Sequence, residues 1–257
     1  MRWTHFEFFG PLAILFWLLG LWFVLKKNDK AVLAIAIGAA VSLVFIIGLW
    51  IGLKRPPFRT MGETRLWYSL FLSVLGILAH RRWGYPWLLA FGAALAIVFA
   101  AVNLLKPEIH SKTLMPALMS PYFIPHVTLY ILSYALLAAS AVGSVVIMVK
   151  RRKGAEDPKL LDLVDNLVHV GVGALMLGLI LGALWAKAAW GHYWSWDPKE
   201  TWAFVTAAAF LLYIHLRRIG LKNALTLWVL PVAFLFLMMT WLGVNYLPTA
   251  AQSVHVY

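Results

Sequence analysis

The chain has 257 residues, of which 63% are hydrophobic and 12% are charged, whereas an ordinary soluble domain is about half apolar and about a quarter charged. This composition excludes a soluble globular protein and predicts one that crosses a membrane several times. The net charge of +12 is interpreted as a signal that sets the orientation of the chain in the membrane. The lipid bilayer is therefore an expected partner, and nucleic acid is not.

Eight apolar runs follow one another along the chain and predict an all-α polytopic membrane protein, a single bundle over residues 1–257 with about eight transmembrane helices. The runs cover residues 8–25, 31–53, 66–80, 85–105, 122–149, 166–187, 201–219 and 224–247. The first follows the acidic Glu7 and has no small-residue cleavage site behind it, so it is expected to remain a membrane helix.

Lysine and arginine residues in alternate loops predict which side each loop faces, because basic residues are retained on the cytoplasmic side. One set of loops holds thirteen of them, in tight clusters such as KRRK at 150–153, and the other set holds nine. Both termini and the loop after the sixth run are therefore placed on the extracytoplasmic side. The compact chain favours a bacterial inner membrane. The absence of cysteine excludes disulfides and thiolate ligands.

Tryptophan is concentrated around the predicted external loop at 188–200, which we call the tryptophan loop. Five of the fourteen tryptophans lie close together here: Trp185, Trp190, Trp194, Trp196 and Trp202. Single tryptophans are common at membrane interfaces, but such a belt is spread over all helix ends. A cluster on one loop favours a flat apolar surface for a planar aromatic ligand such as a porphyrin.

The sequence WDPKE within this loop is typical of the start of a helix. Asp197 is predicted to cap the helix, Pro198 to occupy its first turn and Glu200 to complete a capping box. Asp197 is equally interpreted as a residue of the ligand pocket, and the two roles are compatible.

Two histidines lie on the same predicted side of the membrane as the tryptophan loop. His126 is at the start of the fifth run and His255 is in the C-terminal tail. In a chain without cysteine, imidazole is the natural axial ligand of a haem iron, and one histidine on each face of the ring forms a stable pair. For His192, inside the loop, three roles stay open: a ligand of the iron, a residue that contacts such a ligand without binding the iron, or a simply exposed side chain.

His215 lies in the seventh run, close to the basic residues that mark its cytoplasmic end. An ionisable side chain at that depth is costly unless it faces a cavity or a partner, so His215 is predicted to be functional. No predicted span holds two histidines, which argues against a fixed electron-transfer haem inside the membrane.

The stretch WGHYWSWDPKETW resembles the WWD signature of the haem-handling proteins of cytochrome c biogenesis, in the form found in the CcsA (ResC) family. The similarity extends to PHVTLYILSYALL, YIHLRR and GVNYLPTAAQSVHVY, and RPPFRTMGETRLWYSL is similar as well. Members of this family are subunits of the System II cytochrome c synthase. The resemblance implies an enzyme subunit that receives haem b from the cytoplasmic side and displays it on the outer surface, with haem b as both ligand and substrate.

The resemblance also implies particular site residues. Two external histidines ligate the iron in the family and match His126 and His255, while the inner-site histidine, shared with a CcsB (ResB) partner, matches His215. The haem surface is expected to include Trp190, Trp194, Trp196 and Asp197. The haem vinyl groups are then joined to the thiols of a CXXCH motif on an apocytochrome c. No catalytic residue of this chain is identified, and it is expected to be inactive without its partner.

Alternatives stay open at this point. His192 is a third external imidazole within the signature, so the pair that ligates the iron is not decided. The chain is alternatively a haem transporter or chaperone of the CcmC type, which loads a carrier without ligation. A third hypothesis is a structural or quinone-linked membrane subunit with a rich aromatic belt, which would bind no haem.

Overall fold

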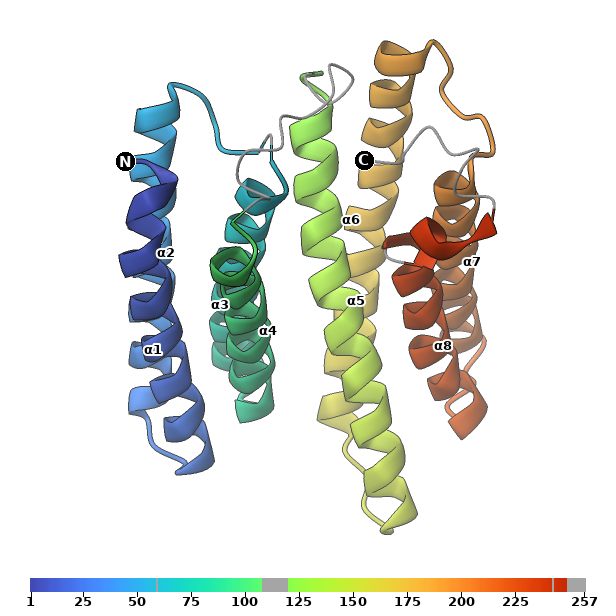
Figure 1. The fold of residues 1–257 in the computed structure, drawn as a ribbon. Helices are drawn as coiled ribbons and strands as arrows, with labels where there is room; N and C mark the ends of the chain where they lie inside the picture. Colours follow the sequence, from blue (N-terminus) through green and yellow to red (C-terminus); the bar gives the residue numbers. More distant parts are fainter. Residues whose placement is uncertain (59, 108–119, 242, 249–257) are drawn as a thin grey trace. The chain divides into compact units, whose positions relative to one another are not determined.

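The computed structural model describes residues 1–58, 60–107, 120–241 and 243–248. Within these residues the fold is all helical, with eight α-helices, two short 3-10 helices and no strand. The chain forms two compact units, Met1–Leu114 and Met115–Tyr257, each built around four of the α-helices (Figure 1). The grouping of both into one bundle domain stays a prediction.

The first unit is a four-helix arrangement in which α1 packs against α2 and α4, and α3 packs against α4 and α2. Its helices are α1 (Phe6–Leu25), α2 (Lys30–Leu53), α3 (Met61–Trp83) and α4 (Pro86–Leu105). Small residues let the helices approach closely, because Ala93 and Ala96 of α4 are fully buried in the same cluster as Trp17 of α1 and Ile35 of α2.

The segment before α3 is fixed by a buried carboxylate. Glu63 receives two hydrogen bonds from Arg55, of 2.8 and 2.9 Å, and its side chain is 1% exposed. Thr60 and Glu63 form a reciprocal capping box at the start of α3. The loop that resembles the CcsA family in this unit is therefore anchored to the helix that follows it.

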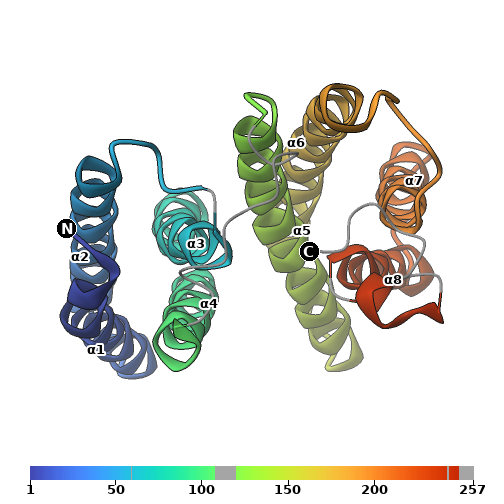
Figure 2. The ribbon, with the colours of Figure 1, turned by 45° about the horizontal axis from the view of Figure 1, so that its top comes forward.

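In the second unit α5 packs along α6, α8 packs against α5 and α7, and α7 packs against α6 and α8 (Figure 2). Its helices are α5 (Phe123–Arg152), α6 (Pro158–Trp190), α7 (Pro198–Arg218) and α8 (Ala224–Trp241), followed by the 3-10 helix η4 (Gly243–Tyr246). We call the end that carries the α6–α7 connection the loop end. The opposite end, which carries the cluster at 150–153 together with Arg217, Arg218 and Lys222, is the basic end.

In the part of the chain that the structure describes, six helices are long and apolar enough to cross a membrane: α2, α4, α5, α6, α8 and the combined span Trp3–Leu25. The helices α3 and α7, with 23 and 21 residues, are less apolar and carry charged side chains in their first and last turns. The chain is thus an all-helical, multi-pass membrane protein, with eight α-helices in its described residues and six of them candidate spans. The number of about eight transmembrane helices and the sidedness of the termini stay predictions.

Several helix boundaries differ from the apolar runs. The helix α6 begins at Pro158, well before the predicted start at residue 166, because the Asp157 carboxylate caps it by accepting a bond of 2.9 Å from the Leu160 amide. It continues to Trp190, into the predicted loop at 188–200. The helix α8 ends at Trp241, short of residue 247. Hydropathy marks the apolar length of a helix, whereas caps set its ends.

Candidate functional site

The tryptophan loop is shorter than predicted, because only residues 191–197 separate α6 from α7. Gly191 ends α6 with a φ of 86°, a left-handed conformation that glycine adopts without steric cost. Asp197 caps α7, and its carboxylate accepts a bond of 2.8 Å from the Lys199 amide. The predicted cap at Asp197 and Pro198 in the first turn are therefore confirmed.

Glu200 holds the loop to the first turn of α7. Its side chain is buried, with the residue 8% exposed. The Oε2 atom accepts bonds from the Ser195 amide at 2.7 Å, the Asp197 amide at 3.2 Å and the Ser195 hydroxyl at 3.3 Å. The predicted capping box is confirmed, but the two bonds from Ser195 go beyond it and make Glu200 the anchor of the loop.

Trp196 is displayed at the surface in a strained conformation. Its φ is 58°, in the left-handed region that non-glycine residues rarely adopt, and the residue is 63% exposed. Its ring lies edge-on to Trp194, with centroids 5.8 Å apart, and edge-on to Phe204, 5.9 Å away. These three rings form an outward aromatic patch, which we call the loop cluster.

His126 lies in the first turn of α5 and is bonded to α6. Its Nδ1 atom lies 2.7 Å from the carbonyl oxygen of Gly178. A carbonyl can only accept, so Nδ1 carries the proton in the neutral ring, and Nε2 carries the lone pair that a metal ligand uses. This arrangement fits a histidine that ligates iron, since such histidines commonly donate their other ring N–H to a carbonyl or carboxylate.

Aromatic rings surround this imidazole. Trp185 stacks on it with centroids 5.7 Å apart and an interplanar angle of 22°, and Tyr130 lies 4.3 Å away. Trp190 meets Trp185 edge-on at 4.7 Å. We call His126, Tyr130, Trp185 and Trp190 the histidine cluster. Trp190, at the end of α6, is therefore joined to His126 through Trp185.

Two glycines of α6 make room for the histidine cluster. A Cβ on Gly178 would lie 2.5 Å from the Tyr130 ring, and one on Gly182 would lie 2.7 Å from Cε1 of His126. Real Cβ atoms do not approach so closely, so any side chain at either position would displace the rings of α5. The two glycines thus form the surface of α6 on which the rings of His126 and Tyr130 pack.

His215 lies at the basic end of α7, on an exposed face of the helix. His215 follows Asp197 by 18 positions, which correspond to roughly 27 Å of helix, close to the thickness of a bilayer core. Next to it, Arg217 forms an ion pair of 2.6 Å with Asp165 of α6, and the Tyr213 hydroxyl donates to the same carboxylate at 2.7 Å. His215 is therefore remote from the tryptophan loop.

The two remaining histidines of the predicted site are His192 and His255. His192 is exposed within the loop, and no hydrogen bond or ring contact joins it to another described residue. His255 lies outside the described residues. Within the part of the chain that the structure describes, no three histidine, aspartate or glutamate side chains come together as a metal-ion site.

Residues 6–251 match the model of the cytochrome C assembly protein family. The chain belongs to this family. A role in cytochrome c assembly, with the haem handling that it entails, follows from membership.

Proteins with the name "Cytochrome c biogenesis protein CcsA" resemble the chain in sequence. The protein of Chlamydomonas reinhardtii is 35% identical over 204 residues, which cover 74% of this chain and 55% of that protein. The protein of Atropa belladonna is 31% identical over 84% of this chain and 83% of its own length, and that of Prochlorococcus marinus is 26% identical over 95% and 92%. The predicted resemblance to the CcsA family is therefore confirmed.

A solved structure, that of "Cytochrome c Heme Lyase CcmF", has the same fold. It is 20% identical and superposes with a TM-score of 0.69 over 94% of this chain and 47% of its own. The chain thus spans about half the length of CcmF and of the Chlamydomonas relative. The similarity to CcmF therefore shows the fold alone.

Proposed function

We propose that the chain is a membrane subunit of a cytochrome c synthase, which displays haem b at the tryptophan loop for attachment to apocytochrome c. The observation that carries the proposal is the bond from Nδ1 of His126 to the Gly178 carbonyl, because it orients the ring and places the ligand lone pair on Nε2. His255, outside the described residues, is the second axial ligand in this proposal.

The aromatic rings at the loop end suit a porphyrin substrate. Trp190 and Trp185 extend the histidine cluster, and Trp194 and Trp196 give the loop an exposed aromatic surface held by Glu200 and Asp197. Such a surface excludes water and fixes a planar ligand by stacking, while His126 fixes its distance from the helix. The role of this chain in the proposal is to bind and orient the haem.

The attachment itself is an addition without net oxidation or reduction. Each thiol of the apocytochrome CXXCH motif adds across a haem vinyl group: the S–H bond and the vinyl π bond break, and a C–S bond forms. The terminal vinyl carbon takes the hydrogen and becomes a methyl group. Both thiols come from the apocytochrome, since this chain has no cysteine.

His215 serves an inner haem site in this proposal, shared with a CcsB (ResB)-like partner subunit. Its position on an exposed face at the basic end of α7 supports a ligand that is completed by another chain. The distance from the tryptophan loop supports two separate haem positions, one near each membrane surface. With the basic end cytoplasmic, the loop faces the exterior of a bacterial inner membrane.

The test uses the protein purified in detergent together with its partner. The Soret spectrum of wild type is compared with those of His126→Gly and the control His192→Gly. We expect His126→Gly to lose external haem and exogenous imidazole to restore it, because imidazole can occupy the cavity left by the ring, while His192→Gly keeps haem. Loss of haem in His192→Gly alone would identify His192, within the loop, as the ligand of the iron and would overturn the assignment of His126.

A second measurement separates ligation from simple transport. The complex is supplied with an apocytochrome peptide that contains CXXCH, and covalent haem attachment is followed by mass spectrometry. A haem-loaded complex that forms no thioether, but passes haem to a separate carrier protein, would favour the CcmC-type alternative.

A further inference from the structure

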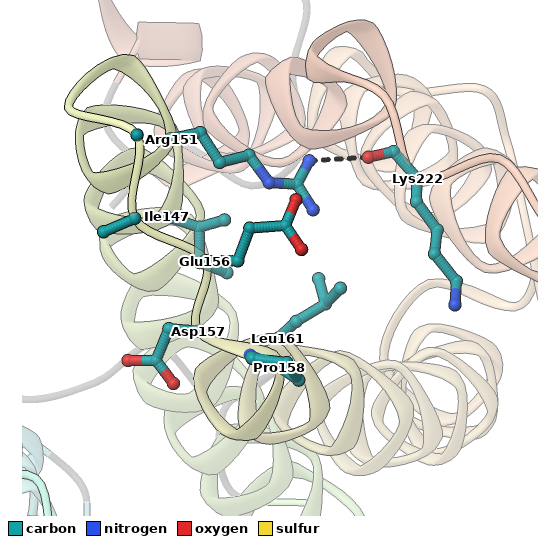
Figure 3. Close-up of a pocket in the computed structure, with 9 residues that line it drawn as sticks. Ile147, Arg151, Glu156, Asp157, Pro158, Leu161 and Lys222 are labelled. Atoms are coloured by element: carbon teal, nitrogen blue, oxygen red, sulfur yellow. Dashed lines mark hydrogen bonds between the residues drawn. The ribbon is translucent and has the colours of Figure 1, made fainter.

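The basic end of the second unit holds a cavity of about 470 Å³, far from the tryptophan loop. Figure 3 shows it between the end of α5, the start of α6 and the α7–α8 connection. Its apolar wall is formed by Ile147, Pro158 and Leu161, and its lining also includes the charged residues Arg151, Glu156, Asp157 and Lys222. Both α5 and α6 are candidate membrane spans, so the cavity lies where the bilayer meets water.

The cations of the cavity are held on two different elements. An Nη1–H of Arg151 donates a bond of 2.6 Å to the carbonyl oxygen of Lys222, which fastens the end of α5 to the α7–α8 connection. The Lys222 side chain runs along the opposite wall (Figure 3). Two positive groups therefore face one space from elements that lie far apart in the sequence.

Glu156 adds a carboxylate that points into the same space (Figure 3). Among the described residues, neither Glu156 nor the Lys222 ammonium has an ion-pair partner within 4.0 Å. The neighbouring Asp157 points away from the cavity and is already paired with Lys150 at 2.6 Å. The cavity thus offers two cations and one carboxylate, with an apolar wall beside them.

We propose that this cavity binds the headgroup of an ethanolamine phospholipid, with the phosphate between Arg151 and Lys222 and the ammonium at Glu156. Basic pockets at the ends of transmembrane helices suit phospholipid headgroups. A headgroup that carries only a phosphate would leave the Glu156 carboxylate facing an anion. A choline headgroup has a quaternary nitrogen, with no N–H to donate to that carboxylate. The apolar wall accepts the glycerol and first acyl carbons, which favours a lipid over a soluble ester. This site goes beyond the proposed function.

The test measures lipid selectivity by native mass spectrometry of the full chain in complex with its partner. Ethanolamine, glycerol and choline phospholipids are added in equal amounts. Wild type is expected to retain the ethanolamine lipid about fivefold over the other two, the effect of one exposed ion pair of about 1 kcal/mol. Glu156→Gln should abolish the preference for ethanolamine over glycerol headgroups, and Lys222→Gln should weaken the retention of both.

Two matched variants control for charge at this end of the molecule. Asp162→Asn and Lys153→Gln remove exposed charges close in sequence that do not line the cavity, and both should retain the wild-type selectivity. An unchanged preference in Glu156→Gln, or equal retention of all three lipids by wild type, would overturn the proposal. Complete displacement of the lipid by soluble phosphoethanolamine would also overturn it, because it would identify a soluble ester as the ligand.

Discussion

Gly182 of α6 lies directly against His126 of α5, so that a Cβ on the glycine would fall 2.7 Å from the imidazole Cε1 atom. The same imidazole is bonded to the carbonyl of Gly178, one helical turn earlier. The histidine is thus held by two positions of α6 that must both remain without a side chain.

Gly182→Ala is expected to displace the His126 ring and to lower the haem content of the purified complex at least several-fold. The overpacking should cost about 1–3 kcal/mol of stability. The matched control is Gly173→Ala in the same helix, since a Cβ there meets no atom within 4 Å. Haem content is measured by Soret absorbance per mole of protein. Equal haem content in the two variants would show that the position of His126 does not decide binding.

Glu200→Ala should release the tryptophan loop, because the Ser195 and Asp197 amides lose the carboxylate that accepts their bonds. The loss of this cap is expected to destabilise the protein by about 1–2 kcal/mol. Limited proteolysis should then cleave between residues 191 and 197 faster than in wild type. Glu200→Gln keeps one carbonyl acceptor and should be cleaved more slowly than Glu200→Ala. Identical cleavage of Glu200→Ala and wild type would contradict the anchoring role.

Local chemistry at the tryptophan loop could be predicted from the sequence alone. The cap at Asp197 and the capping box depend on residues within one helical turn, and WDPKE contains all of them. These features are local, so no knowledge of the fold was needed.

Other features of the site could not be predicted in this way. The partner of His126 is a carbonyl 52 positions along the chain, and it is chosen by the register of α5 on α6. The left-handed backbone of Trp196 follows from the bonds that Glu200 makes around it, since nothing in a tryptophan favours that conformation. The ends of α6 were wrong by several residues because caps, rather than hydropathy, determine them.

Trp196→Gly separates the conformation of this residue from the function of its ring. A non-glycine residue in the left-handed region costs about 1–2 kcal/mol, and glycine removes that cost. The variant is therefore expected to unfold at a temperature no lower than wild type, while its haem attachment to apocytochrome falls. Thermal unfolding in detergent and covalent product formation are measured on the same samples. If a stable Trp196→Gly protein attached haem to apocytochrome at the normal rate, the Trp196 ring would not be part of the surface that binds haem.

The ion pair between Asp165 and Arg217 should matter more for stability than the pair between Lys150 and Asp157. The first joins α6 to α7 at 2.6 Å with the Arg217 side chain 11% exposed, and the Tyr213 hydroxyl donates to the same carboxylate. The second has the same length, but its lysine is 42% exposed, so solvent screens it. Asp165→Asn leaves a largely buried guanidinium without its counter-charge, which is expected to cost about 2 kcal/mol or more.

Lys150→Gln is the matched control, because it removes one charge from the other pair and leaves the Asp157 cap of α6 in place. Its expected cost is below about 1 kcal/mol. Chemical denaturation of both variants in detergent gives the comparison. Since Arg217 also fixes the helical segment that carries His215, Asp165→Asn should lower haem at the proposed inner site, while haem at the proposed outer site, roughly 27 Å along α7, is retained. Equal stabilities of the two variants would show that the Asp165 pair is screened as effectively as the exposed one.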